Sequence, residues 1–173
     1  MIKFCWPLPL LGALAFAGCT RDQNANPIPT PGVKITLTQT IWLPGKDDRL
    51  HAKNASRLGL DTQLRQGGNA APVLQEIIQN ASQFFPKGAK INDFQSDGKT
   101  VVVDLNKAFA DDKFWSSQGE KTTELAFYAL VNTASGKENL PVSFTIEGAP
   151  ASTLGEMDAS GQIEPNRKLV AAK

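Results

Sequence analysis

The sequence predicts an α+β domain: an open-faced sandwich in which two helices cover one face of a mixed or antiparallel sheet. Several short segments alternate apolar and polar residues, which is the period of strands with one buried face. Two longer segments instead carry apolar residues at helical spacing. Because the strands alternate rather than being apolar throughout, one sheet face should be packed and the other wet. The expected order of elements is β-β-α-β-β-α-β.

The first two strands are predicted as a hairpin. Val33 to Leu37 alternate apolar and polar side chains, and Ile41 to Leu43 extend the same strand. Pro44 to Asp48 carry turn residues, and Leu50 to Ala55 are the expected return strand. Residues 57–69 are rich in glycine and polar side chains, so this stretch is predicted to be a loop.

Two helices follow from the spacing of apolar residues. The first is expected over Ala71 to Phe85, where one apolar stripe recurs every three or four residues and Pro86 ends the pattern. The second is expected over Glu120 to Ala134. Its middle leaves little polar surface, so we expect this helix to be central and covered on several sides. Gly136 suits its C-terminal cap.

The remaining strands lie before and after the second helix. Ile91 to Gln95 and Thr100 to Leu105 flank Asp97-Gly98, a pair that favours a tight hairpin turn. Val142 to Ile146 alternate most regularly of all and predict the last strand. The segment between the hairpin and the second helix, which holds Asp111, Asp112 and Trp115, is predicted to be a loop.

Residues 1–18 have the features of an export signal. Lys3 is followed by an apolar run from Phe4 to Phe16 and by the small residues Ala17 and Gly18. The Gly-Cys junction resembles the bacterial lipobox, in which the cysteine receives a lipid before cleavage. We therefore expect Cys19 to be the lipidated first residue of an exported protein held on a membrane of the bacterial cell envelope. An ordinary secretory signal with a chance cysteine is the alternative.

The rest of the chain divides into a tether, a domain and a tail. Residues 19–32 lack hydrophobic periodicity and contain three prolines near their end, which is typical of an extended tether. Residues 33–163 form the expected domain. Residues 164–173 are polar and are predicted to be a C-terminal tail.

Charge and cysteine content exclude several functions. The chain has 18 basic and 17 acidic residues, and Lys3 is the one charged residue of the signal, so the mature protein is formally neutral. A nucleic-acid binder would show a clustered positive excess, so no nucleic-acid partner is expected. Removal of the signal leaves Cys19 as the single cysteine and His51 as the single histidine. We therefore expect no disulfide, metal or cofactor.

Five segments of the chain resemble, in order and spacing, those of the GerMN domain family of envelope lipoproteins. They are Val33 to Pro44; Phe85 to Lys90; Asp97-Gly98 with Val103 to Phe109; Glu124 to Thr133; and Glu147-Gly148 with Leu154 to Gly161. The resemblance covers about residues 33–163. It implies a sporulation- or germination-like protein with a fold similar to the ring-building-motif domains of secretion rings. Such domains are non-catalytic and assemble side by side or dock onto partners outside the inner membrane.

The sequence gives little support for a catalytic site. A Ser-His-Asp arrangement would have to use His51, which lies beside a turn with no nucleophile-elbow sequence in the chain. The carboxylate pairs Asp47-Asp48 and Asp111-Asp112 could serve glycan cleavage or calcium binding, but each is an adjacent pair in a predicted loop. Asp104 follows a strand and is expected to turn or cap the backbone. We predict no catalytic residue and no enzyme.

Three aromatic residues are the candidate interaction surface: Trp115, Phe114 and Trp42. They either roof the core or anchor a partner. The first functional hypothesis is a non-catalytic, lipid-anchored envelope protein whose domain binds envelope proteins or copies of itself. The alternative is a peptidoglycan-binding module with Trp115 and Phe114 stacked on sugars. A cell-wall hydrolase is the third hypothesis.

Overall fold

A computed structural model of the chain describes residues 39–66 and 68–172. The predicted signal, the lipidation candidate Cys19, the tether and the Val33 to Leu37 segment lie outside the described residues. No helix in the described part is both long enough and apolar enough to cross a bilayer.

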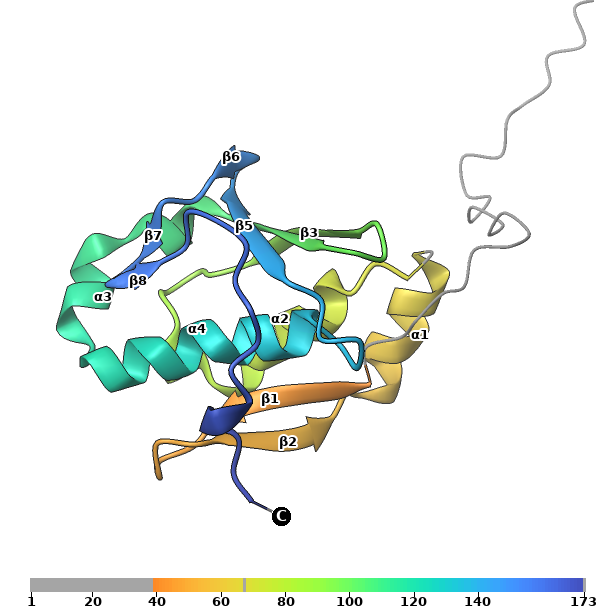
Figure 1. The fold of residues 1–173 in the computed structure, drawn as a ribbon, viewed down its shortest axis with the longest axis horizontal. Helices are drawn as coiled ribbons and strands as arrows, with labels where there is room; N and C mark the ends of the chain where they lie inside the picture. The colour runs from red at the N-terminus through yellow and green to blue at the C-terminus, as the bar shows by residue number, and fades with distance from the viewer. Residues whose placement is uncertain (1–38, 67, 173) are drawn as a thin grey trace, which may run out of the picture.

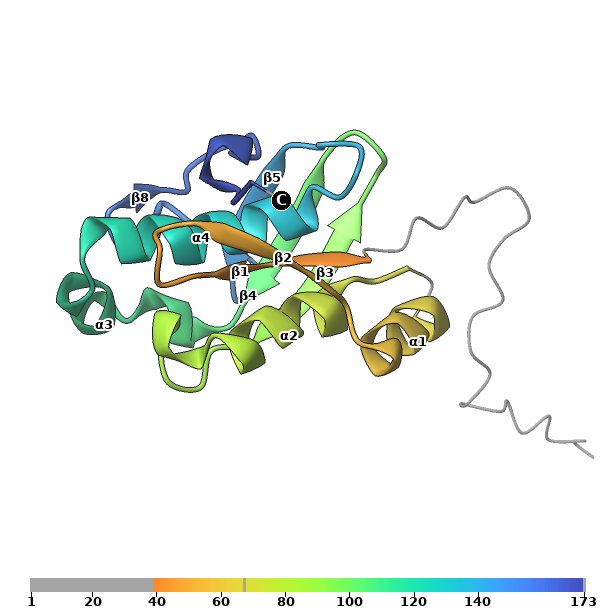
Figure 2. The same ribbon diagram turned by 90° about the horizontal axis from the view of Figure 1, so that it is seen from below.

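The described part of the chain is arranged in three layers (Figures 1 and 2). One outer layer is a four-stranded sheet with the order β3-β4-β5-β6. The middle layer holds two helices, α2 (Ala71–Asn80) and α4 (Glu120–Ala134). The other outer layer is the hairpin of β1 (Thr40–Pro44) and β2 (Leu50–Asn54), which contacts both of these helices through β1.

The four-stranded sheet is mixed. Its strands are β3 (Ile91–Ser96), β4 (Val101–Leu105), β5 (Val142–Ile146) and β6 (Ala149–Pro150). The β4–β5 pair is parallel, and the β3–β4 and β5–β6 pairs are antiparallel. The parallel pair arises because α4 crosses over between β4 and β5, as parallel neighbours require. The predicted α+β class, mixed sheet and placement of two helices on one sheet face are confirmed.

The predicted hairpin forms as β1 and β2, but it does not join the main sheet. Ile41 is fully buried, and the backbone N–H of Trp42 donates to the Thr133 hydroxyl of α4 at 3.0 Å. The hairpin therefore packs on the side of the helices away from the main sheet. This arrangement explains why α4 is apolar almost all round: ten of its fifteen residues are buried between the two layers.

The prediction of a loop over residues 57–69 is wrong, because α1 (Arg57–Arg65) forms there. The Ser56 hydroxyl accepts from the Gly59 amide at 3.0 Å, which caps the helix start. Glu76 of α2 in turn accepts hydrogen bonds from the Ser56 amide and hydroxyl. Gly59 lies so close to the Glu76 carboxylate that a Cβ there would collide with it. The glycine that resembles a loop signal thus lies within a helix, where a side chain would displace the Glu76 carboxylate.

Other differences between the predicted and the observed elements involve shorter segments. The first predicted helix ends at Asn80 and is followed by the 3₁₀ turn η1 (Ser82–Phe84). After the 3₁₀ turn η2 (Lys107–Ala110), the predicted loop around Asp112 contains α3 (Asp112–Ser117). The Asp111 carboxylate accepts from the Phe114 amide at 3.2 Å and caps that helix. After β6, the strands β7 (Thr153–Leu154) and β8 (Met157–Asp158) form a small ribbon.

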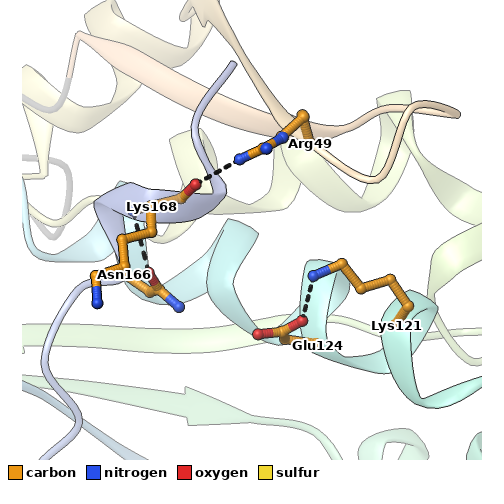
Figure 3. A network of polar contacts seen from close by, with 5 residues as sticks. All are labelled: Arg49, Lys121, Glu124, Asn166 and Lys168. Atoms are coloured by element: carbon orange, nitrogen blue, oxygen red, sulfur yellow. Dashed lines mark hydrogen bonds and ion pairs between the residues drawn. The ribbon is translucent and has the colours of Figure 1, made fainter. Parts of the chain in front are cut away.

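The C-terminal segment packs on the domain, although its polar sequence resembles a free tail. Leu169, in the 3₁₀ turn η3 (Arg167–Leu169), is only 6% exposed. The Arg49 guanidinium donates to the Lys168 carbonyl at 2.7 Å, and the Asn166 side chain accepts from the Lys168 amide at 3.1 Å (Figure 3). The Ala171 amide donates to the Leu50 carbonyl at 2.9 Å. The segment is thereby attached to β2.

Candidate functional site

The free edge of β3 is the first surface with unpaired binding capacity. In β4 the Val101 amide points to β5, since it donates to the Pro141 carbonyl at 2.9 Å. By alternation, the Val102 backbone points to β3 and pairs with Gln95. The backbone groups of Phe94 and Ser96 therefore point away from the sheet. No strand in the described part of the chain pairs with this edge.

The opposite edge of the sheet is closed. β6 pairs with the end of β5, the Ala151 amide donates to the Phe144 carbonyl at 3.0 Å, and Val142 exchanges two hydrogen bonds with Ile163. The two edges thus differ: one is covered by the chain itself, and the other presents a row of unpaired groups. An unpaired edge is a template for strand addition.

The outer face of the sheet is uncovered and carries mostly polar side chains. Figure 1 shows both middle-layer helices on the opposite face. Val102 is 36% exposed on this outer face, and Leu58, on α1, is the one other large apolar side chain exposed in the described residues. The outer face is therefore exposed to solvent, as the alternating strands predict.

Asp104 holds the outer face and the β5–β6 turn together. Its carboxylate accepts from the Thr145 hydroxyl at 2.6 Å, from the Gly148 amide at 2.8 Å and from the Asn92 side chain at 3.1 Å. Glu147 and Gly148 form the two-residue turn, and both have positive φ angles, 51° and 79°. Such angles are typical of a type I′ hairpin. Asp104 thus holds a turn in the backbone, the role expected for it.

The charge of Asp104 is stabilised by these donors. Partial burial opposes ionisation, but the hydrogen bonds from Thr145, Gly148 and Asn92 outweigh it and hold the pKa of Asp104 below its ordinary value of 3.8. Asp93 faces Asp104 across the β3–β4 pair. Hydrogen bonds from Gln95, the Phe94 backbone and Asn69 hold the pKa of Asp93 below its ordinary value too, against burial and the charge of Asp104.

The second surface is a hollow of about 390 Å³ at the start of β1, the C-terminal end of α4 and the C-terminal segment. Its walls include an indole ring, two cationic groups and two side-chain amides near the helix end. The lining residues used below are Trp42, Asn132, Lys137, Asn139, Arg167 and Val170.

Arg167 anchors one wall of the hollow. Its guanidinium lies 5.6 Å from the Trp42 ring centroid, within the range of a cation–π contact. It donates to the Gly136 carbonyl at 3.0 Å and to the Asn139 side-chain oxygen at 2.6 Å. Asn139 has a left-handed backbone, with φ at 53°, which turns the loop after α4 back toward the hollow. A cation at the C-terminal end of α4 also complements the helix dipole.

The three aromatic candidates occupy different environments. Trp115 is 4% exposed, its indole N–H donates to the Phe109 carbonyl at 2.8 Å, and a Cβ on Gly155 would lie 2.9 Å from its Cβ. Phe114 is half-buried, with its ring 5.0 Å from that of Trp115 in an edge-on contact. Trp115 is therefore part of the hydrophobic core and covers one side of it. Of the three, only Trp42 lines the hollow.

The catalytic candidates are not brought together. His51 Nε2 lies 2.8 Å from Asp47 Oδ1 on an exposed turn. This hydrogen bond holds the pKa of Asp47 below its ordinary value, the opposite of what a general acid in glycan cleavage needs. Asp111 caps α3 instead of facing a second carboxylate. In the ranges 39–66 and 68–172, no three His, Cys, Asp or Glu side chains cluster as metal ligands.

The layered arrangement places the protein among small α+β sandwich domains with one open sheet edge. The family model Germane, described as sporulation and spore germination, matches residues 44–152, more than half of the chain. The chain therefore belongs to the Germane family, as the GerMN resemblance predicted, and is a sporulation- and germination-related protein. No curated protein and no solved structure matches it.

Sequence reasoning missed most of the hollow. Arg167 and Val170 lie in the predicted tail, and Asn132 lies on a helix whose sequence indicates only burial. One signal was available: an asparagine within an otherwise apolar helix needs hydrogen-bond partners, which the tail supplies through the Asn166 carbonyl at 2.9 Å.

Proposed function

We propose that this protein is a non-catalytic, lipid-anchored component of the bacterial cell envelope whose Germane domain binds other proteins. Cys19 would carry the lipid, and the tether would hold the domain away from the membrane. The domain would recruit or assemble with an envelope protein, or with copies of itself.

The observation that carries this proposal is the asymmetry of the main sheet. The chain covers the β5 edge with β6 and Ile163 but leaves the Phe94 and Ser96 backbone groups of β3 unpaired. A partner strand laid along β3 would gain main-chain hydrogen bonds at once. The peptidoglycan hypothesis has less support, since of the two stacking residues that it names, Trp115 is buried and Phe114 is half-buried against it.

The test is in-cell photo-crosslinking of the full-length protein. A photoreactive residue at Ser96, on the open edge, is compared with one at Lys113, an exposed position on α3. We expect discrete protein adducts from Ser96 and few from Lys113, since only the first position lies on the unpaired edge. Cys19→Ser should weaken the Ser96 adducts, because an unanchored protein meets envelope partners less often.

Two results would contradict the proposal. Equal adducts from Ser96 and Lys113 would mean that the β3 edge is not the binding surface. No protein adducts, with muropeptides retained instead, would replace protein binding with the peptidoglycan-binding alternative.

A further inference from the structure

The hollow at Trp42 lies partly outside the residues that match the family model. Trp42, Arg167 and Val170 fall before or after residues 44–152, whereas Asn132, Lys137 and Asn139 fall within them. The hollow is thus built where the flanking segments meet the end of α4. It is separate from the β3 edge that carries the proposed function.

The hollow is positively charged. Lys137 and Arg167 line it, and among the residues that the structure describes no carboxylate does. Neither cation forms an ion pair with any described residue. The Glu138 carboxylate lies beside the Gly136 backbone, where a Cβ would be 3.2 Å from Oε2, but Glu138 is not part of the lining. The local charge therefore favours an anion.

The guanidinium of Arg167 has donor capacity to spare. Its Nε and Nη2 groups are engaged with the Asn139 side chain, the Ser135 hydroxyl and the Gly136 carbonyl. Its Nη1 group makes one long contact, 3.4 Å to the Asn132 carbonyl. Because an Nη group carries two N–H donors, at least one remains for a ligand. Burial lowers the pKa of Arg167, because removing the guanidinium charge from water costs free energy.

Asn132 contributes the complementary acceptor. The residue is 1% exposed and lines the hollow, and its Nδ2 group donates to the Asn166 carbonyl at 2.9 Å. Its Oδ1 is the one buried side-chain polar atom without a partner in the described residues. Buried acceptors are usually hydrogen-bonded, so Asn132 Oδ1 has the capacity to accept a hydrogen bond from a ligand N–H.

We propose that the hollow binds the free C-terminal carboxylate of a short peptide. The carboxylate is held by Arg167 Nη1 and the Lys137 ammonium group, and the last peptide N–H donates to Asn132 Oδ1. A small apolar side chain lies against Trp42 and Val170. The volume of about 390 Å³ falls within the roughly 300–1,000 Å³ typical of ligand pockets and suits a dipeptide end.

The test uses the indole N–H signals of the full-length protein labelled with ¹⁵N-tryptophan. Of the three tryptophans, Trp6 lies in the expected export signal, so the processed protein gives two indole signals, and Trp42→Phe assigns the one at the hollow. The probes are acetyl-Ala-Ala with a free carboxylate, in its L,L and D,D forms, and the two matching C-terminal amides. We expect the free acids to shift the Trp42 signal, with a dissociation constant of about 1 mM or below, and to leave Trp115 in place.

Matched variants locate the anion. Lys137→Gln should weaken binding of the free acid about tenfold, because it removes a charge-assisted contact, whereas Lys113→Gln on α3 should leave it unchanged. Lys137 forms no ion pair with another residue in the described ranges, so we expect its variant to keep the domain folded, which an unshifted Trp115 signal verifies. Preference for the D,D form would assign the ligand to wall stem peptides, and preference for the L,L form to protein C-termini.

The proposal fails if the acids and amides shift Trp42 equally, since the carboxylate would then not be recognised. It also fails if Lys137→Gln binds as Lys113→Gln does, or if no probe moves the Trp42 signal. The Ser96 crosslinks do not depend on this hollow, so either proposal can fail while the other stands.

Discussion

At the scale of single residues, Asp104 shows how one side chain can stabilise a turn far away in the sequence. It lies on β4, yet its carboxylate binds the Thr145 hydroxyl and the Gly148 amide at the end of β5. Glu147, a non-glycine residue with positive φ, lies within that turn. The carboxylate offsets the conformational cost of the turn by satisfying its amide.

Asp104→Ala should lower the free energy of unfolding by about 2 kcal/mol, because three donors lose a partly buried charged acceptor. Urea denaturation near neutral pH measures this loss. Asp61→Ala, an exposed position on α1, is the control and should change stability by less than about 0.5 kcal/mol.

The stabilisation by Asp104 also depends on pH. The pKa of Asp104 is lowered in the folded state, so its contribution is complete above the unfolded value near 3.8 and is lost as pH falls through the lower folded value. The difference in the free energy of unfolding between wild type and Asp104→Ala should therefore decrease below about pH 4. If this difference in stability instead increases on acidification, the ionised carboxylate is not the stabilising form.

At the scale of elements, α1 depends on a contact with α2 rather than on its own sequence. Ser56 caps α1 through the Gly59 amide, and Glu76 of α2 holds Ser56 by its amide and hydroxyl. The two helices pack directly against each other. A nine-residue helix is short for independent stability in water, so this tertiary contact decides whether it forms.

Ser56→Ala should destabilise α1 by about 1 kcal/mol, since both the cap and the hydroxyl contact with Glu76 are lost. Hydrogen exchange of the α1 amides should accelerate about fivefold, with α4 amides unaffected. Ser56→Thr keeps the hydroxyl and should restore protection, and Ser152→Ala, an exposed serine, is the neutral control. Unchanged α1 exchange in Ser56→Ala would show that the cap does not hold the helix.

At the scale of the whole molecule, the C-terminal segment closes the three-layer arrangement. It runs from the Ile163 bridge at β5, past the end of α4, to the Leu50 bridge at β2. It therefore touches the sheet, the helix layer and the hairpin in turn (Figures 1 and 3). The exposed Lys121–Glu124 pair on α4 contributes little by comparison, because water screens it.

Leu169→Ala should lower the free energy of unfolding by about 2 kcal/mol, since Leu169 is 6% exposed within the core. Leu58→Ala provides the matched control, because Leu58 is 73% exposed and its truncation should be nearly neutral. Thermal unfolding of wild type and both variants measures these changes in stability. Equal stability of the two variants would mean that the C-terminal segment is not part of the cooperative fold.

The sequence by itself determined the elements whose burial follows from local periodicity: the β1–β2 and β3–β4 hairpins, α2, α4 and β5. Strand and helix periods are properties of neighbouring residues, so they can be predicted without a fold. The same local patterns, in order, were enough to indicate the family.

Only the tertiary structure decided the features that depend on distant partners. α1 forms through Glu76, Trp115 turns inward against Gly155, and Arg167 reaches Trp42 from the far end of the chain. The separation of the β1–β2 hairpin from the main sheet belongs to the same group, since α4 lies between them. Each outcome rests on contacts between residues far apart in sequence, whose energies no local pattern encodes.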